Sequence, residues 1–121
     1  MAKSEGMGSE ITKSPSPERA TDLISAAVAV AFTVPVTELR APSRRPASIA
    51  LARQSAMYLT HVMLGLTFTE VGRVFGRDRT TAAHACRRIE DRRTEARLDA
   101  ALAELEQALR RDFVRKPGAV A

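Results

Sequence analysis

The sequence contains a single cysteine, Cys86, which excludes an intramolecular disulfide and fits a reducing intracellular compartment. It has no stretch of the roughly 20 apolar residues that a membrane span requires. The longest candidate, residues 24–36, is interrupted by Ser25, Thr33 and Pro35. A basic region followed by an apolar run, the mark of a secretory signal, is also absent from the N-terminus. We therefore expect a cytoplasmic protein with no membrane partner.

Motifs for nucleotide, metal and catalytic chemistry are missing as well. There is no Gly-x-x-x-x-Gly-Lys-Ser/Thr phosphate loop, so we expect no nucleotide partner. His61, His84 and Cys86 match no common zinc spacing, and Cys86 is better explained as a small core residue. Asp78 and His84 are six residues apart without a nucleophile beside them. We expect no cofactor, no metal and no enzymatic activity.

The charge is concentrated in the middle of the chain. The 121 residues carry a net charge of +5, which suggests a polyanionic partner. Residues 39–69 hold four arginines and no acid, and residues 70–97 hold eight arginines against five acids. The segment before residue 39 is net acidic, and the segment after residue 97 is neutral. A positive field over the centre is the electrostatic footprint expected of a nucleic-acid-binding protein.

The length allows one domain, and its pattern is helical throughout. We expect a disordered tail over 1–16, a helical domain over 17–113 and a flexible tail over 114–121. Within the domain the spacing predicts helices from 17 to about 33, from 47 to about 64, from 67 or 69 to 75, from 78 or 79 to about 93, and over 95–113. No segment is typical of a strand, so the predicted fold class is all-α, a compact helical bundle.

Apolar residues at helical spacing predict the packing faces of these helices. In chain order they are Leu23, Ala27, Val30 and Ala31; Ile49, Ala52, Ala56, Leu59 and Met63; Ala82, Ala85, Cys86 and Ile89; and Leu98, Leu102, Leu105, Leu109 and Phe113. The last set is most simply a face that packs on the bundle. Because it spans barely two heptads, a homodimer seam is the lesser alternative.

A short helix, a tight turn with Gly76 and a polar-faced helix form a helix-turn-helix pattern. The N-terminal residues of the second helix in such a unit point into the major groove. There Asp78 can accept a hydrogen bond from cytosine, Arg79 can donate to guanine, and the Thr80 methyl can contact the thymine methyl. The free amides of the first turn also favour a phosphate nearby.

The segments RQSAMYL (53–59) and FTEVGRVFGRDRTTAAHACRRI (68–89) carry a family resemblance. Together with their helical flanks they resemble the C-terminal DNA-binding domain of the bacterial replication initiator DnaA, over roughly residues 21–109. The resemblance implies a Trp-repressor-like bundle that reads double-stranded DNA with the helix over 78–93. It implies no ATPase part, so we expect the DNA-reading module to act alone.

The resemblance also implies roles for individual residues. Arg45 matches an arginine that enters the minor groove, and Arg53 and Gln54 match phosphate and base contacts. Asp78 and Thr80 match base-reading positions, whereas Thr81 and His84 match positions that contact the DNA backbone. Arg87 and Arg88 lie where further phosphate contacts are expected.

This sequence departs from the family pattern in the turn. The family usually has Phe-Gly-Gly-Arg-Asp-His-Thr-Thr, whereas this chain has one glycine fewer and places Arg79 at the base-reading histidine. The predicted function is a sequence-specific, double-stranded DNA-binding regulator of transcription or replication, associated with the nucleoid. The alternative is a protein-interaction module that binds a partner through its terminal helices, including the helix over 95–113.

Overall fold

The computed structural model describes residues 16–39, 41 and 47–114. These residues form α2 (Pro17–Phe32), the 3-10 helix η1 (Val36–Leu39), α3 (Ala47–Leu64), α4 (Phe68–Phe75), α5 (Arg79–Arg92) and α6 (Ala96–Val114). No strand occurs in the described part of the chain, and the predicted all-α class is confirmed. The two predicted tails lie outside the described residues, apart from Ser16 and Val114.

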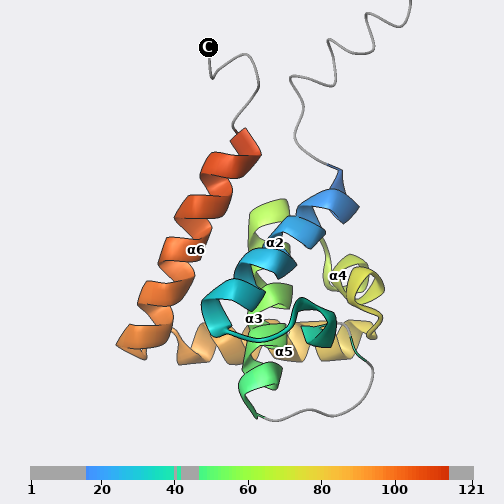
Figure 1. The fold of residues 1–121 in the computed structure, drawn as a ribbon. Helices are drawn as coiled ribbons and strands as arrows, with labels where there is room; N and C mark the ends of the chain where they lie inside the picture. Colours follow the sequence, from blue (N-terminus) through green and yellow to red (C-terminus); the bar gives the residue numbers. More distant parts are fainter. Residues whose placement is uncertain (1–15, 40, 42–46, 115–121) are drawn as a thin grey trace, which may run out of the picture.

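Helix α3 is the centre of the bundle and packs against every other element. Figure 1 shows α2 and α6 alongside α3, with α5 lying across one end of the molecule. Helix α2 begins and α6 ends at the opposite end.

Short-range chemistry sets the helix boundaries. The Ser16 hydroxyl caps α2 by accepting a hydrogen bond from the Arg19 amide at 3.3 Å, and Pro17 occupies the first turn. Thr67 and Glu70 form a capping box at the start of α4, with Thr67 N–H to Glu70 Oε1 at 2.8 Å and Glu70 N–H to Thr67 Oγ1 at 3.1 Å. Gly65 ends α3 with a φ of 68°.

The core confirms most of the predicted packing faces. Ala82, Ala85, Cys86 and Ile89 are the buried residues of α5. In α6 the four leucines are buried, and Phe113 packs at the edge of the core. Burial, with a smaller effect of Glu90, raises the pKa of the Cys86 thiol to about 11. Cys86 is therefore an unreactive core residue.

The packing face of α2 differs from the sequence pattern. Leu23, Ala27, Val30 and Ala31 repeat at helical spacing, yet Val30 is 80% exposed and Leu23 is 37% exposed. The buried residues are instead Ala20, Thr21, Ile24, Ser25, Val28 and Ala29. Alanine and valine occur on several sides of this helix, so the apolar repeat alone does not select the side that meets α3.

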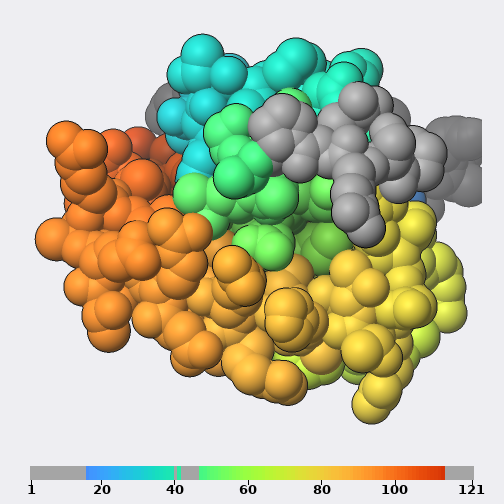
Figure 2. All heavy atoms as spheres, turned by 90° about the horizontal axis from the view of Figure 1, so that it is seen from below, coloured from blue at the N-terminus to red at the C-terminus, as the bar shows by residue number. Residues whose placement is uncertain are grey.

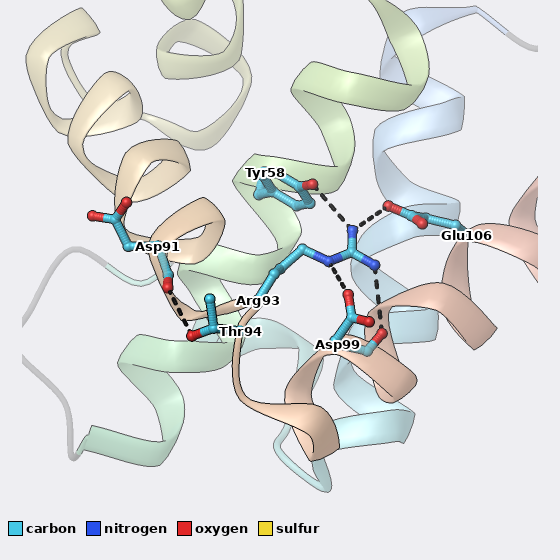
Figure 3. A network of polar contacts seen from close by, with 6 residues as sticks. All are labelled: Tyr58, Asp91, Arg93, Thr94, Asp99 and Glu106. Atoms are coloured by element: carbon cyan, nitrogen blue, oxygen red, sulfur yellow. Dashed lines mark hydrogen bonds and ion pairs between the residues drawn. The ribbon is translucent and has the colours of Figure 1, made fainter.

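The docking of α6 depends on one arginine (Figure 3). Arg93, at the end of α5, donates from Nε to Asp99 Oδ1 at 2.6 Å and from Nη1 to Glu106 Oε2 at 2.9 Å. The same Nη1 donates to the Tyr58 hydroxyl of α3 at 3.1 Å. Desolvation opposes the charge of Arg93, but the hydrogen bonds that it donates to Tyr58, Glu106 and Asp99 raise its pKa overall. One guanidinium thus joins three helices.

Ser55 in α3 provides a test of the core. Its side chain is fully buried, and its Oγ has no hydrogen-bond partner among the described residues. Because an unsatisfied buried hydroxyl is unfavourable, we expect Ser55→Ala to raise the free energy of unfolding by about 1 kcal/mol in urea denaturation.

The matched control is Thr60→Val on the same helix. Thr60 is equally buried, but its hydroxyl donates to the Ala56 carbonyl at 2.7 Å. This change should lower the free energy of unfolding by roughly 0.5–1.5 kcal/mol, the net contribution of one hydrogen bond. A loss of stability in both variants would contradict the interpretation of Ser55.

In the described ranges no helix combines the length and the apolar character that crossing a membrane requires.

Candidate nucleic-acid interface

Helices α4 and α5 are joined by a three-residue turn, Gly76, Arg77 and Asp78. Gly76 ends α4 with a left-handed φ of 66°, and its N–H donates to the Arg73 carbonyl at 3.3 Å. The Arg77 N–H donates to the Gly72 carbonyl at 2.8 Å. These two bonds form a Schellman motif, so a single glycine closes the turn without the second glycine of the family pattern.

Gly72 allows the turn to fold back onto α4. A Cβ at this position would lie 2.6 Å from the Arg77 carbonyl oxygen and 3.0 Å from the carbonyl carbon and oxygen of Asp78. Those neighbours are backbone atoms, which cannot move aside as a flexible side chain can. The close approach therefore fixes where α5 begins relative to α4, and this role of Gly72 was not predicted from the sequence.

Asp78 caps the N-terminus of α5. Its Oδ1 accepts a hydrogen bond from the Thr81 amide at 2.8 Å. The backbone and side-chain hydrogen bonds of Thr81, with a smaller one from the Thr80 amide, lower the pKa of the Asp78 carboxyl against weak desolvation. The carboxylate is therefore ionised at neutral pH and exposed beside the first turn. A base contact by the same residue stays a prediction.

The solvent-facing side of α5 collects most of the predicted contact residues. Arg79, Thr80, Thr81, His84, Arg87 and Arg88 are all exposed. The side chains of Arg79, Arg87 and Arg88 make no hydrogen bond or ion pair with the described residues. These three exposed cationic groups, which point in different directions around α5, are therefore available for an external anion. Arg92, next along the helix, is instead paired with Glu95 at 3.0 Å.

A second part of the same face comes from η1 and the start of α3. Figure 2 shows these elements, in teal and green, next to α5 in yellow to orange. Gln54 is half-buried there. Arg53 is also half-buried and donates from Nε to the Leu39 carbonyl at 3.0 Å and from Nη2 to the Glu38 carbonyl at 2.9 Å. Arg45, the predicted minor-groove residue, lies outside the described residues.

Arg77 was not among the predicted site residues, yet it connects the two parts. Its Nη2 donates to the Ala41 carbonyl at 2.7 Å, and its Nη1 lies 3.5 Å from the carbonyls of Phe75 and Gly76. The bond to Ala41 joins residues 36 positions apart in the chain. No periodicity or motif could have indicated a contact at that separation.

The histidine and cysteine side chains do not gather into a metal site. His61 Nδ1 donates to the Leu66 carbonyl at 2.7 Å, and its ring stacks on Phe68 with centroids 4.5 Å apart. His61 therefore supports the connection between α3 and α4. Over residues 16–39, 41 and 47–114 there is no group of three or more His, Cys, Asp or Glu side chains placed to hold a metal.

Comparison with known proteins agrees with this geometry. Residues 21–89 match the family model described as the bacterial DnaA protein helix-turn-helix. The chain is 45% identical over 76 residues to the chromosomal replication initiator protein DnaA of Bifidobacterium animalis subsp. lactis, covering 62% of this chain and 13% of that protein. It is 49% identical over 69 residues to the DnaA of Bordetella pertussis, covering 55% of this chain and 15% of that protein.

A longer match, 40% identical over 89 residues, links the chain to the DnaA of Burkholderia multivorans and covers 72% of this chain and 17% of that protein. The chain thus spans less than a fifth of the length of these relatives. The matched region contains α4, the turn and α5 up to Ile89, which together form the helix-turn-helix unit. The chain belongs to the bacterial DnaA helix-turn-helix family.

Proposed function

We propose that this protein binds double-stranded DNA sequence-specifically and regulates replication or transcription. The observation that carries the proposal is the exposed part of α5, which has three arginines without described partners and a capped N-terminus. Asp78, Arg79 and Thr80 are the residues that we assign to base edges in the major groove. Thr81, His84, Arg87 and Arg88 are assigned to the phosphate backbone.

The relatives are named chromosomal replication initiator proteins, and this supports a role at the nucleoid in the cytoplasm. The matched family model describes a helix-turn-helix, so the role that we propose for the chain is DNA binding and not catalysis. The proposal assigns no cofactor or nucleotide to the described residues.

The proposal is tested by gel-shift titration of the full chain against duplex fragments over a range of salt concentrations. Each phosphate contact that releases a counterion should contribute about −0.9 to the slope of log K against log salt. We expect a steep negative slope, together with competition by one preferred duplex. Binding that is absent, or insensitive to salt, would refute the proposal.

Arg79 provides the test of sequence specificity. Because its side chain can donate two hydrogen bonds to guanine, Arg79→Ala should relax the preference at one base pair by about 1–3 kcal/mol. Selection of bound sites from random duplexes, for wild type and variant, measures this change directly.

Arg88→Ala is the matched control on the same helix. Arg88 is assigned to a phosphate, so its loss should weaken all duplexes about equally and reduce the salt slope by about 0.9. Identical site preferences in wild type and Arg79→Ala would show that Arg79 does not read a base.

One observation favours the alternative of a protein-interaction module. Val30 of α2 is 80% exposed and lines apolar hollows that continue to Val36 on one side and to Leu105 of α6 on the other. The leucine face of α6 is buried within the monomer and does not offer a dimer seam. A pull-down repeated after nuclease treatment separates the two functions, because a partner retained without DNA would support the interaction module.

A further inference from the structure

Two arginines from different elements hold the same short stretch of backbone. Arg53 of α3 binds the carbonyls of Glu38 and Leu39 at 2.9 and 3.0 Å, and Arg77 of the turn binds the carbonyl of Ala41 at 2.7 Å. The stretch that they hold is the end of η1 and Ala41, two residues beyond it. Both guanidinium groups are therefore used inside the protein.

The chemistry of a helix end explains why two arginines bind this stretch of backbone. The last carbonyls of a helix lack partners within it, and η1 has only four residues. Positive charge at this end is favourable, and charged donors make stronger hydrogen bonds than neutral ones. Within the stretch itself, the Ala41 N–H reaches the Glu38 carbonyl only at 3.4 Å. The arginines are thus the stronger hydrogen-bond donors to this stretch.

Arg53 belongs to helix α3, whereas Arg77 belongs to the turn between α4 and α5. It immediately precedes Asp78, the cap of α5, and its own backbone N–H is held by the Gly72 carbonyl at 2.8 Å. Its position is therefore set by the helix-turn-helix, while its side chain holds the end of η1. The Arg77 side chain therefore links the position of the helix-turn-helix directly to Ala41.

We propose that Arg77 is a positioning residue of the DNA interface, which sets the place of the η1 end relative to the first turn of α5 and does not bind a phosphate itself. The inference rests on the proposed function for its effect on DNA, whereas the bridge itself exists without DNA. Holding two contact surfaces in place before binding reduces the entropy that binding must overcome.

The experiment compares Arg77→Ala, Arg77→Lys and the control Arg87→Ala in the full chain. Hydrogen exchange without DNA should be several-fold faster at the amides of Glu38 and Ala41 in Arg77→Ala, and unchanged there in Arg87→Ala. Amides from Ala85 to Ile89 in the middle of α5 should exchange as in wild type in both variants.

Binding to the preferred duplex is then measured over a range of salt concentrations. Arg77→Ala should lose about tenfold in affinity through lost preorganisation, with the salt slope unchanged. Arg87→Ala should reduce the slope by about 0.9, as expected for one phosphate contact. Lysine can replace arginine at a phosphate but cannot reproduce the planar fork, so Arg77→Lys should lose affinity nearly as Arg77→Ala does.

Two results would overturn the inference. Unchanged exchange at Glu38 and Ala41 in Arg77→Ala would show that the bridge does not hold the η1 end. A salt slope reduced by about 0.9, with affinity restored in Arg77→Lys, would make Arg77 a phosphate contact. If wild type binds no duplex, the effect on DNA fails together with the proposed function, while faster exchange in Arg77→Ala would still establish the bridge.

Discussion

Replacing Gly72 by alanine is expected to destabilise the protein and to reduce its affinity for DNA. The added Cβ would lie 2.6 Å from the Arg77 carbonyl oxygen, so the backbone of the turn must move. Overpacking of this kind costs about 1–3 kcal/mol, and only about 1 kcal/mol is recovered from the better helix propensity of alanine. The displaced turn carries Asp78, so α5 should shift on α4 even in the molecules that fold.

Urea denaturation and the salt-dependent gel shift measure the two effects separately. We expect a lower free energy of unfolding and a loss of more than about tenfold in affinity for the preferred duplex, since misplacing α5 affects every base contact at once. Unchanged DNA affinity in a folded Gly72→Ala variant would show that the turn tolerates the displacement.

Gly76 is the matched control, because it is constrained by its backbone conformation and not by a lack of space. A Cβ at Gly76 would meet no atom within 4 Å, but its φ of 66° is left-handed. Gly76→Ala should therefore cost about 1–2 kcal/mol from backbone strain alone. Gly76→Asn should cost less, because asparagine tolerates this conformation. The comparison distinguishes a glycine that is needed for space from one that is needed for its φ.

The second large effect is expected at Arg93. Removing its guanidinium in Arg93→Ala leaves Glu106, whose side chain is only 20% exposed, without its partner at the junction of α3, α5 and α6. Breaking a fully buried pair by removing one partner costs about 3–5 kcal/mol. This site is partly solvated, so we expect a loss of about 2–3 kcal/mol in urea denaturation.

Arg92→Ala is the control one residue earlier. Its ion pair with Glu95 has side chains that are 37% and 50% exposed, and such surface pairs contribute about 0–1 kcal/mol. The double variant Arg93→Ala with Glu106→Gln should recover part of the lost stability, because only the carboxylate of Asp99, whose side chain is 51% exposed, then loses its partner. Similar losses in Arg92→Ala and Arg93→Ala would contradict the role assigned to Arg93.

Helix boundaries and the buried face of α5 could be predicted because both depend on neighbours along the chain. The caps at Ser16, Thr67 and Asp78 are contacts between residues three apart. On α5, polar and charged residues occupy every side except one, so the apolar repeat selects one face. On α2 the same reasoning was wrong, since small apolar residues occur on all sides of the helix and packing against α3, α6 and η1 decides which of them are buried.

The arginines of the candidate interface likewise differ in ways that the sequence does not indicate and the structure does. The sequence places Arg53, Arg77, Arg79, Arg87 and Arg88 within a single positive region and cannot rank them. The structure commits Arg53 and Arg77 to backbone carbonyls 14 to 36 residues away and leaves the other three exposed. A guanidinium already bound to a carbonyl and one that faces solvent have the same charge but different availability to a phosphate.

Local chemistry along the chain was therefore sufficient for the all-α class, the helix-turn-helix and the family. Capping, glycine turns and helical periodicity involve residues that are close together in the chain, so the order of residues predicts them directly. Only the tertiary contacts show which face of α2 is buried and why Gly72 has no room for a side chain. They also show which arginines remain exposed and available to DNA. These features depend on distances between segments far apart in sequence, and such distances exist only once the helices have packed.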